Sequence, residues 1–193
     1  MVTSVAFYLG GLALLAGERL LELTIARRNA RRAFAEGAVE VGQVHFRVMT
    51  VVHTLFLGAC AGEVLLAHRP FPGTLGAVAL VVAIAAQCLR YWAITTLGER
   101  WNVRIIVLPH AAPVTTGPYR FVRHPNYLAV ILEIAAVPLI HGAWVTAVVF
   151  TVANAVLLGV RIRSEEAALG RAWAQAFDRH PRFVPRVRPE AES

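Results

Sequence analysis

The sequence predicts an all-α integral membrane protein with about five transmembrane helices, and three observations support this prediction. Hydrophobic residues make up 57% of the 193 residues and charged residues only 16%, whereas a soluble domain usually carries about 25% charge. The mean hydropathy is +0.57. Several segments approach the roughly 20 apolar residues that a helix needs to cross a bilayer. The length suits a single domain, and we expect one membrane domain over residues 1–193.

The apolar runs place the spans at about residues 5–25, 48–67, 75–94, 127–141 and 143–160. Arg19 is the first arginine and follows the first apolar run, so this run lacks the basic start of a signal peptide and we expect it to remain as a span. The last two runs are short and meet at Gly142. They predict a tight helical hairpin, in which Pro138 kinks the first arm.

The chain after the last span reads as a separate amphipathic cytoplasmic helix over residues 164–178. Ser164 is a suitable N-cap, and Glu165 and Glu166 fall in the first turn, where the helix dipole favours negative charge. We expect His180 and Pro181 to end this helix.

The distribution of charge predicts the orientation. All 19 basic residues are arginines and the net charge is +7. The first loop, the third loop and the tail are arginine-rich, whereas the second loop has only Arg69 and the turn at Gly142 has none. The positive-inside rule then places the N-terminus outside and the C-terminus in the cytoplasm. We expect the plasma membrane as the location of the protein. The sequence contains no nucleic-acid module, and Cys60 and Cys88 lack the spacing of a metal site. We therefore predict that the protein binds neither nucleic acid nor a metal ion, and we predict no protein partner.

Polar and ionisable residues interrupt the predicted spans, and such residues are usually paired or functional. They are Glu18, Arg19, Glu22, His53, Glu63, Gln87, Arg90, Glu133 and Asn154. One interpretation is pairing between helices, for instance Arg19 with a carboxylate of another span. The alternatives are a polar cavity that admits a head group or cofactor, and a haem site with His53 as ligand.

Two polar segments are candidates for chemistry. The first, LGERWNVRIIVLPHAAPVTTGPYRFVRHPNY from Leu97 to Tyr127, is too polar to span, and a long loop of this kind is usually functional. The second, RIRSEEAALG, begins at Arg161. Because the hairpin returns the chain to the face that it left, we expect Arg161, Glu165 and Glu166 to lie near His124 and Tyr127.

The motifs GPYRFVRHPNY and RIRSEEAAL, in this order and spacing, resemble the isoprenylcysteine carboxyl methyltransferase family of membrane enzymes. The stretch RLLELTIARRNARRAFAEGAVEVGQVHFRVMTVVH looks like a bacterial branch of it, some of whose members accompany type III polyketide synthases and methylate alkylpyrones or alkylresorcinols. The resemblance implies an S-adenosylmethionine-dependent O-methyltransferase at the membrane–cytoplasm interface. Its acceptor would be a lipophilic small molecule among the membrane lipids, either a prenylcysteine-like carboxylate or an alkylpyrone or phenolic lipid.

The same resemblance implies roles for individual residues. The cofactor would lie between a loop over residues 97–126 and the start of the C-terminal helix, and its ligands would be Pro113, Val114, Tyr119, His124, Pro125, Asn126, Tyr127 and Glu165. Arg161 would be the catalytic residue that orients the acceptor. Residues 101–110 do not align with the family pattern, so no role is carried over to them. The chemistry suits the assignment, since aromatic faces tolerate a sulfonium cation and a guanidinium holds an anionic oxygen.

Each of these residues also has a plainer interpretation. Tyr119 and Tyr127 fit an interfacial aromatic belt, Arg161 a positive-inside anchor, and Glu165 a helix start. Two other functions also fit the pattern. A membrane reductase of the sterol-reductase type would bind NADPH, with Arg120 and Arg123 near its extra phosphate. A small transporter or scaffold is the non-enzymatic alternative, although the chain shows no paired halves.

Overall fold

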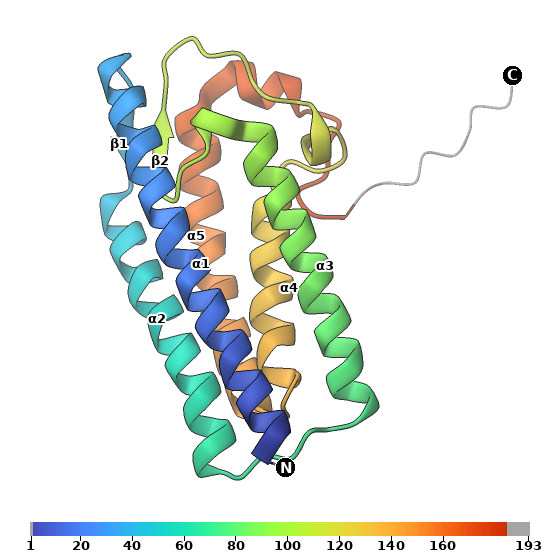
Figure 1. Cartoon of the computed structure of the whole chain (residues 1–193). Helices are drawn as coiled ribbons and strands as arrows, with labels where there is room; N and C mark the ends of the chain where they lie inside the picture. Colours follow the sequence, from blue (N-terminus) through green and yellow to red (C-terminus); the bar gives the residue numbers. More distant parts are fainter. Residues whose placement is uncertain (1, 185–193) are drawn as a thin grey trace, which may run out of the picture.

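The computed structural model describes residues 2–184, apart from the side chain of His45, and forms an elongated helical bundle (Figure 1). Its helices are α1 (Val2–Ala35), α2 (Gln43–Leu66), α3 (Thr74–Leu97), α4 (Pro125–Leu139) and α5 (Trp144–Ala176). Two short 3-10 helices, η1 (Gly98–Arg100) and η2 (Gly117–Arg120), and two strands, β1 (Val39–Val41) and β2 (Ile105–Val107), complete it. The N-terminus lies at one end, and the strands and η2 lie at the other (Figure 1).

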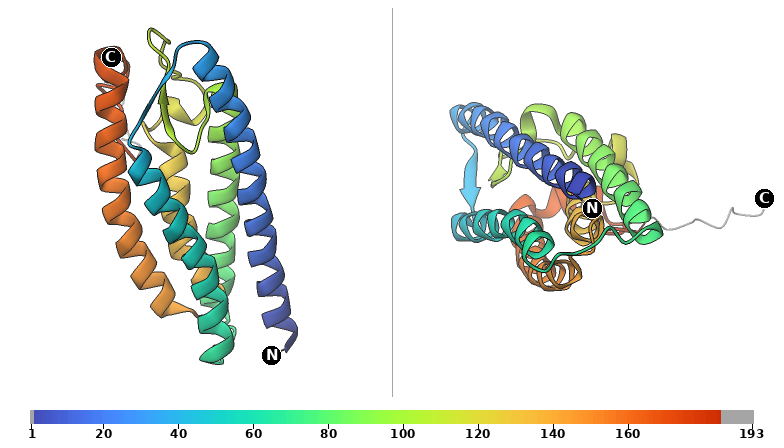
Figure 2. Two further views of the ribbon diagram at one scale, coloured as in Figure 1. Left: turned by 90° about the vertical axis from the view of Figure 1, so that its left-hand side faces the viewer. Right: turned by 60° about the horizontal axis from the view of Figure 1, so that its bottom comes forward.

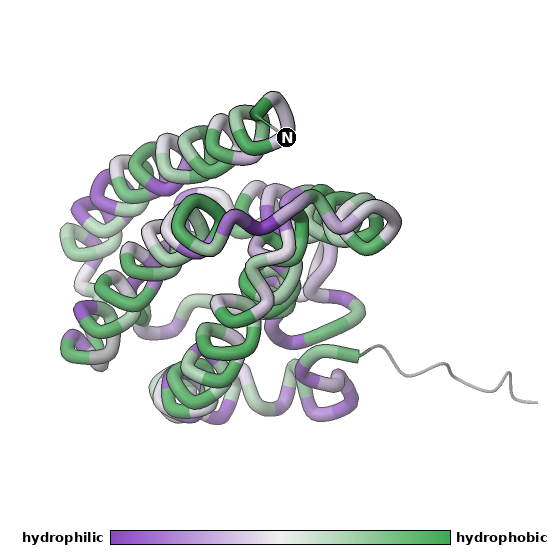
Figure 3. Tube along the Cα trace, turned by 90° about the horizontal axis from the view of Figure 1, so that it is seen from below, coloured by the Kyte–Doolittle hydropathy of each residue, from purple (hydrophilic) through white to green (hydrophobic). Residues whose placement is uncertain are grey.

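The helices have the length and composition of membrane spans. Four are long and apolar enough to cross a bilayer, namely α1, α2 from Phe46, α3 and α5. Hydrophobic residues cover most of their length (Figure 3). The fifth, α4, has 15 residues and is about 22 Å long, which is shorter than the hydrocarbon core. It lies among the other helices (Figure 2). The predicted all-α membrane protein is therefore confirmed, with α4 at the place of the span predicted at 127–141.

The turn between α4 and α5 needs little chain. Gly142 has a φ of 71°, which favours glycine, and the amide of Ala143 donates to the carbonyl of Pro138 at 2.9 Å. Pro138 stands one residue before the end of α4, so it marks the end of the helix rather than a kink within it.

A carboxylate on α2 caps the N-terminus of α5. Glu63 Oε2 accepts hydrogen bonds from both the amide and the hydroxyl of Thr146 at 2.7 Å, and Oε1 accepts one from the amide of Val145 at 3.3 Å. Arg69 forms an ion pair with the same carboxylate at 3.0 Å and stacks over the Trp144 ring. These contacts join α2 to the first turn of α5 and satisfy amides that no residue of α5 itself caps.

We expect Glu63→Ala to lower the free energy of unfolding by about 2 kcal/mol, since it removes a cap and leaves donors unpaired. Glu63→Gln keeps one acceptor oxygen and should lose less than half as much. Thermal unfolding in one detergent measures both variants. Equal stability of wild type and Glu63→Ala would contradict the capping role.

The prediction of a separate helix over residues 164–178 is wrong. Helix α5 runs from Trp144 to Ala176, and Ser164 lies inside it, where its hydroxyl donates to the carbonyl of Val160 at 3.1 Å instead of capping. The helix is interrupted at Gly170, which has φ 73° and ψ −164°. This break redirects the last turn, so that Trp173 and Phe177 pack with Tyr119 against α3.

The two strands were not predicted. Val39, Glu40 and Val41 pair antiparallel with Val107, Ile106 and Ile105. Arg104 reinforces the pairing through a 2.8 Å ion pair with Glu40. We call this element the ribbon; it connects the loop after α1 to the loop after α3.

Ion pairs between helices lie inside the bundle. Arg19 pairs with Glu22 at 2.7 Å and with Glu133 of α4 at 2.8 Å. Arg90 of α3 binds both oxygens of Glu22 at 2.6 Å, and both of these residues are buried. The pairing interpretation of Arg19 is therefore confirmed.

Candidate active site

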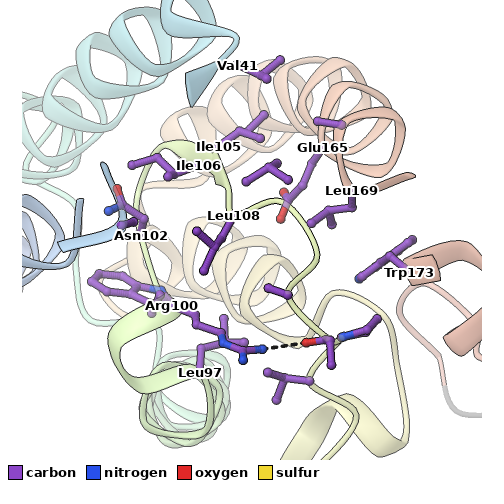
Figure 4. Close-up of a pocket in the computed structure, with 18 of the residues that line it drawn as sticks. Val41, Leu97, Arg100, Asn102, Ile105, Ile106, Leu108, Glu165, Leu169 and Trp173 are labelled. Carbon is purple, nitrogen blue, oxygen red and sulfur yellow. Dashed lines mark hydrogen bonds between the residues drawn. The ribbon is translucent and has the colours of Figure 1, made fainter. Parts of the chain in front are cut away.

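A cavity of about 1150 Å³ lies at the end of the bundle that holds the ribbon (Figure 4). The end of α1, the ribbon, η1, the loop to η2, the start of α4 and the last three turns of α5 form its walls. Its volume exceeds the range of about 300 to 1000 Å³ that is typical of sites for one small molecule. The loop between α3 and α4 is thus built into a wall of this cavity.

One wall of the cavity is aromatic. His124 precedes α4 and Pro125 fills the first helical position, so Tyr127 follows within the first turn. The rings of His124 and Tyr127 stack at 5.3 Å between centroids, and Trp173 lies 5.6 Å from His124. Three aromatic faces from α4 and α5 therefore line the same side.

A carboxylate, a phenol and a guanidinium follow one another at this wall. The Tyr127 hydroxyl donates to Glu165 and accepts from Arg161 Nε at 2.7 Å. Arg161 Nη2 donates to the carbonyl of Val103 at 2.7 Å, and Nη1 approaches the Met49 sulfur at 3.5 Å. The guanidinium thereby connects α4, the segment just before strand β2, and α2.

A second carboxylate fixes His124 from behind. Glu166 lies 3.0 Å from His124 Nε2 and receives two hydrogen bonds from Arg182, at 3.0 and 2.6 Å. The backbone amide of His124 also donates to the carbonyl of Arg182 at 3.2 Å. The imidazole is therefore held in one orientation at the cavity wall.

Tyr119 lies in η2 and is buried against Ala93, Trp173 and Phe177. Burial, and to a lesser degree the negative charge of Glu165, raise the pKa of Tyr119 well above its usual value. Its phenol therefore stays neutral and remains a hydrogen-bond donor at physiological pH.

The structure brings most of the predicted site residues to this cavity. Seven of the nine line it: Pro113, Val114, Tyr119, His124, Asn126, Tyr127 and Glu165. Pro125 is buried in the first turn of α4 and Arg161, 5% exposed, lies behind Tyr127, so neither lines the cavity. We expected the RIRSEEAALG segment to lie near the RHPNY motif, and the structure confirms this. Arg161, Glu165 and Glu166 of the first contact Tyr127 and His124 of the second directly.

Several lining residues were missed by the sequence reasoning. Ile105, Ile106 and Leu108 face Glu165, Leu169 and Trp173 across the cavity (Figure 4). Arg100 Nη1 donates to the carbonyl of Ala112 at 2.6 Å, which holds the loop next to Pro113 (Figure 4). The short apolar run of residues 105–108, with its β-branched Ile105, Ile106 and Val107, was the available signal for a strand, but its partner β1 lies some 65 residues earlier in the chain.

The chemical groups around the cavity fit a cationic organic cofactor that bears an amine and hydroxyls. The Oδ1 atom of Asn126 is buried at the cavity without a hydrogen-bond partner among the described residues, so it offers an acceptor to a bound N–H or O–H. Glu165 offers a carboxylate, and the stacked rings of His124 and Tyr127 offer faces for a cation. S-adenosylmethionine has these groups.

Comparisons with known proteins agree with the motifs. The model of the isoprenylcysteine carboxyl methyltransferase (ICMT) family matches residues 78–171, a range that includes most of the cavity wall. An uncharacterized Bacillus subtilis protein, YpbQ, is 42% identical over 159 residues, which are 82% of this chain and 94% of YpbQ. An uncharacterized Haemophilus influenzae protein is 29% identical over 159 residues, 82% of this chain and 92% of its own length.

Proposed function

The chain belongs to the isoprenylcysteine carboxyl methyltransferase family of membrane methyltransferases, and from this premise we propose that it transfers a methyl group from S-adenosylmethionine to an oxygen atom of a lipophilic acceptor. The observation that carries the proposal is the cavity in which His124, Asn126, Tyr127 and Glu165 meet at the family motifs. The acceptor class is a prenylcysteine-like carboxylate or an alkylpyrone or phenolic lipid.

The cavity residues position the cofactor. S-adenosylmethionine, when bound, supplies a methyl group on a sulfonium, and transfer to an anionic oxygen forms the oxygen–methyl bond as the sulfur–methyl bond breaks. Glu165 and Asn126 accept hydrogen bonds from the amine and hydroxyls, and Pro113 and Val114 contribute backbone contacts. The rings of Tyr119, His124 and Tyr127 exclude water around the cation. Catalysis in this account comes from alignment, which is the main contribution available to an in-line displacement.

Arg161 orients the acceptor in this proposal. Two of its nitrogens, Nε and Nη2, donate to strong oxygen acceptors, Tyr127 Oη and the carbonyl of Val103. The third, Nη1, contacts the thioether sulfur of Met49, which is a weak acceptor. An acceptor oxygen is a better partner than this sulfur, so Nη1 is the atom that we assign to it. A carboxylate acceptor arrives ionised and needs no base, whereas a phenolic or enolic acceptor must first lose its proton to the aqueous solvent before its oxygen accepts the methyl group.

We propose that the cavity faces the cytoplasm of the plasma membrane. The ends of α1 and α5 and the loops at the cavity carry nearly all the arginines outside the bundle, whereas Arg69 lies at the opposite end. The N-terminus is then outside. The soluble cofactor enters from the cytoplasm and the acceptor enters laterally from the bilayer, and a reporter fused after Ser193 should be active in the cytoplasm.

The reaction itself is tested by transfer of a labelled methyl group. Purified protein in nanodiscs is incubated with labelled S-adenosylmethionine and, separately, a prenylated cysteine, an alkylresorcinol and an alkylpyrone. We expect label in an organic-soluble product of at least one acceptor, and base-labile label only for the carboxylate. Absence of label from all three acceptors and from a total lipid extract would contradict the proposed reaction.

We expect Glu165→Ala and His124→Ala each to weaken cofactor binding by about 10- to 100-fold, because each variant loses a hydrogen bond or a contact to a charged group of the cofactor. Equilibrium dialysis with labelled S-adenosylmethionine measures this. The control is Ser164→Ala, which neighbours Glu165 but removes only the hydroxyl bond to Val160. Unchanged affinity in both folded variants would contradict the assignment of this wall to the cofactor.

A further inference from the structure

A groove of about 270 Å³ runs along α5, where it is bordered by Ile131 of α4 and by Arg182 and Phe183, and it lies apart from the cavity. Thr151, Ala155, Gly159 and Arg163 follow one another at four-residue spacing along it, so they form a single stripe of the helix. The twelve steps of helical rise from Thr151 to Arg163 correspond to a groove about 18 Å long. The exposed face of Gly159 has no atom within 4 Å of where a side chain would begin, so this glycine gives the groove depth.

Two arginines stand at the end of the groove that lies on the same side of the bundle as the cavity. Arg163 is exposed and has no hydrogen-bond or ion-pair partner among residues 2–184. Arg182 binds Glu166 through Nε and Nη2, which leaves its Nη1 atom without a partner in the described part of the chain. A positively charged entrance thus adjoins a largely apolar groove, in which Thr151 and Asn154 are the polar residues beyond the arginines, at the depth where a span leaves the membrane.

The groove and the cavity are separate. Tyr127, Leu158 and Ile162 pack together as a buried cluster with Phe183 against it, and they form the wall between the two spaces. No residue lines both. A molecule seated in the groove therefore cannot place an atom beside the cofactor, which argues against a methyl acceptor as its occupant.

We propose that this groove binds one anionic phospholipid of the cytoplasmic leaflet. Its phosphate lies between Arg163 and Arg182, and one acyl chain lies along α5 past Gly159 toward Thr151. Guanidinium groups bind phosphate oxygens with two parallel hydrogen bonds, and basic residues at the cytoplasmic interface attract anionic lipids. Bound in this way, the lipid would cover Ala155 and Gly159 and compensate the charge of Arg163, which has no ion-pair partner among residues 2–184.

The test measures lipid binding directly and needs no enzymatic activity. The full-length protein in detergent is mixed with phosphatidylglycerol or phosphatidylcholine of the same chain length, and bound lipid is counted by native mass spectrometry. We expect one phosphatidylglycerol to be retained and phosphatidylcholine to bind at least tenfold more weakly. Arg163→Gln removes the free charge, and Gly159→Leu fills the groove without backbone strain, so each should weaken retention of phosphatidylglycerol at least tenfold.

Two matched controls separate the groove from general effects. Arg28→Gln removes an exposed arginine from the end of α1, and Gly58→Leu fills open space beside an exposed glycine of α2. Both should retain the lipid as wild type does. Equal loss in variant and control, or equal retention of the two lipids by wild type, would overturn the proposal, whereas the methyltransferase proposal depends on neither result.

Discussion

Arg161→Ala should reduce methyl transfer by about 100- to 1000-fold, the usual effect of removing a preorganised donor from the reacting group. The variant loses the donor that we assign to the acceptor oxygen, and it loses the bonds to Tyr127 and Val103 that fix the cavity wall. Cofactor affinity should fall much less, by about tenfold or below, because Glu165 still accepts from Tyr127.

The matched variant is Arg161→Lys. An ammonium keeps the charge but cannot reach three partners in the geometry of a planar fork, so it should recover little activity. The measurement compares single-turnover methyl transfer and cofactor dissociation constants for wild type and the two variants in one detergent. Wild-type turnover by Arg161→Ala would exclude the orienting role, and equal losses in turnover and cofactor affinity would make Arg161 a structural residue only.

Arg90→Ala should lower the stability of the folded bundle by about 3–5 kcal/mol, because it leaves the buried Glu22 carboxylate without its closest partner. The double variant Arg90→Met with Glu22→Gln removes both charges and should recover much of this loss. Thermal unfolding in detergent measures the three proteins, with Arg28→Ala as the control for loss of an exposed arginine. A loss below about 1 kcal/mol for Arg90→Ala would contradict this expectation and show that Arg19, which also pairs with Glu22, is sufficient to compensate the carboxylate.

The sequence allowed the helices to be predicted because the apolar runs are longer than any soluble core requires. Their ends were less predictable. Helix α5 continues past Arg161, because Ser164 and the two glutamates that follow it tolerate a helix interior as well as a helix start. The sequence does not show that the helix is interrupted at Gly170 rather than before Ser164. A second helix that begins at Ser164 was therefore a reasonable interpretation of the same residues.

The candidate site was predictable as far as it depends on neighbours in sequence. Both motifs adjoin the short turn at Gly142, and two helices joined by a tight turn must return to the same face. The contacts of Tyr127 with Glu165 and Arg161 follow from this geometry. The ribbon does not, since β1 and β2 are three residues each and pair across a long sequence separation. Strands this short carry almost no periodic signal.

The burial of Arg161 inside the bundle could not be predicted from the sequence either. An arginine at the end of a span usually extends to the interface, and the interpretation of Arg161 as a positive-inside anchor would place it there. In the fold it is buried, because Tyr127, Val103 and Met49 come from three different segments to meet it. This arrangement explains how a charged group is retained inside the bundle, and it places the proposed acceptor oxygen beside Met49 rather than in open water.

The most direct test of the central claim is calorimetric titration of the purified wild-type protein with S-adenosylmethionine, and separately with NADPH. We expect saturable binding of one S-adenosylmethionine per chain, competition by its demethylated product, and no heat with NADPH. Binding of NADPH with no response to S-adenosylmethionine would contradict the account and favour a membrane reductase.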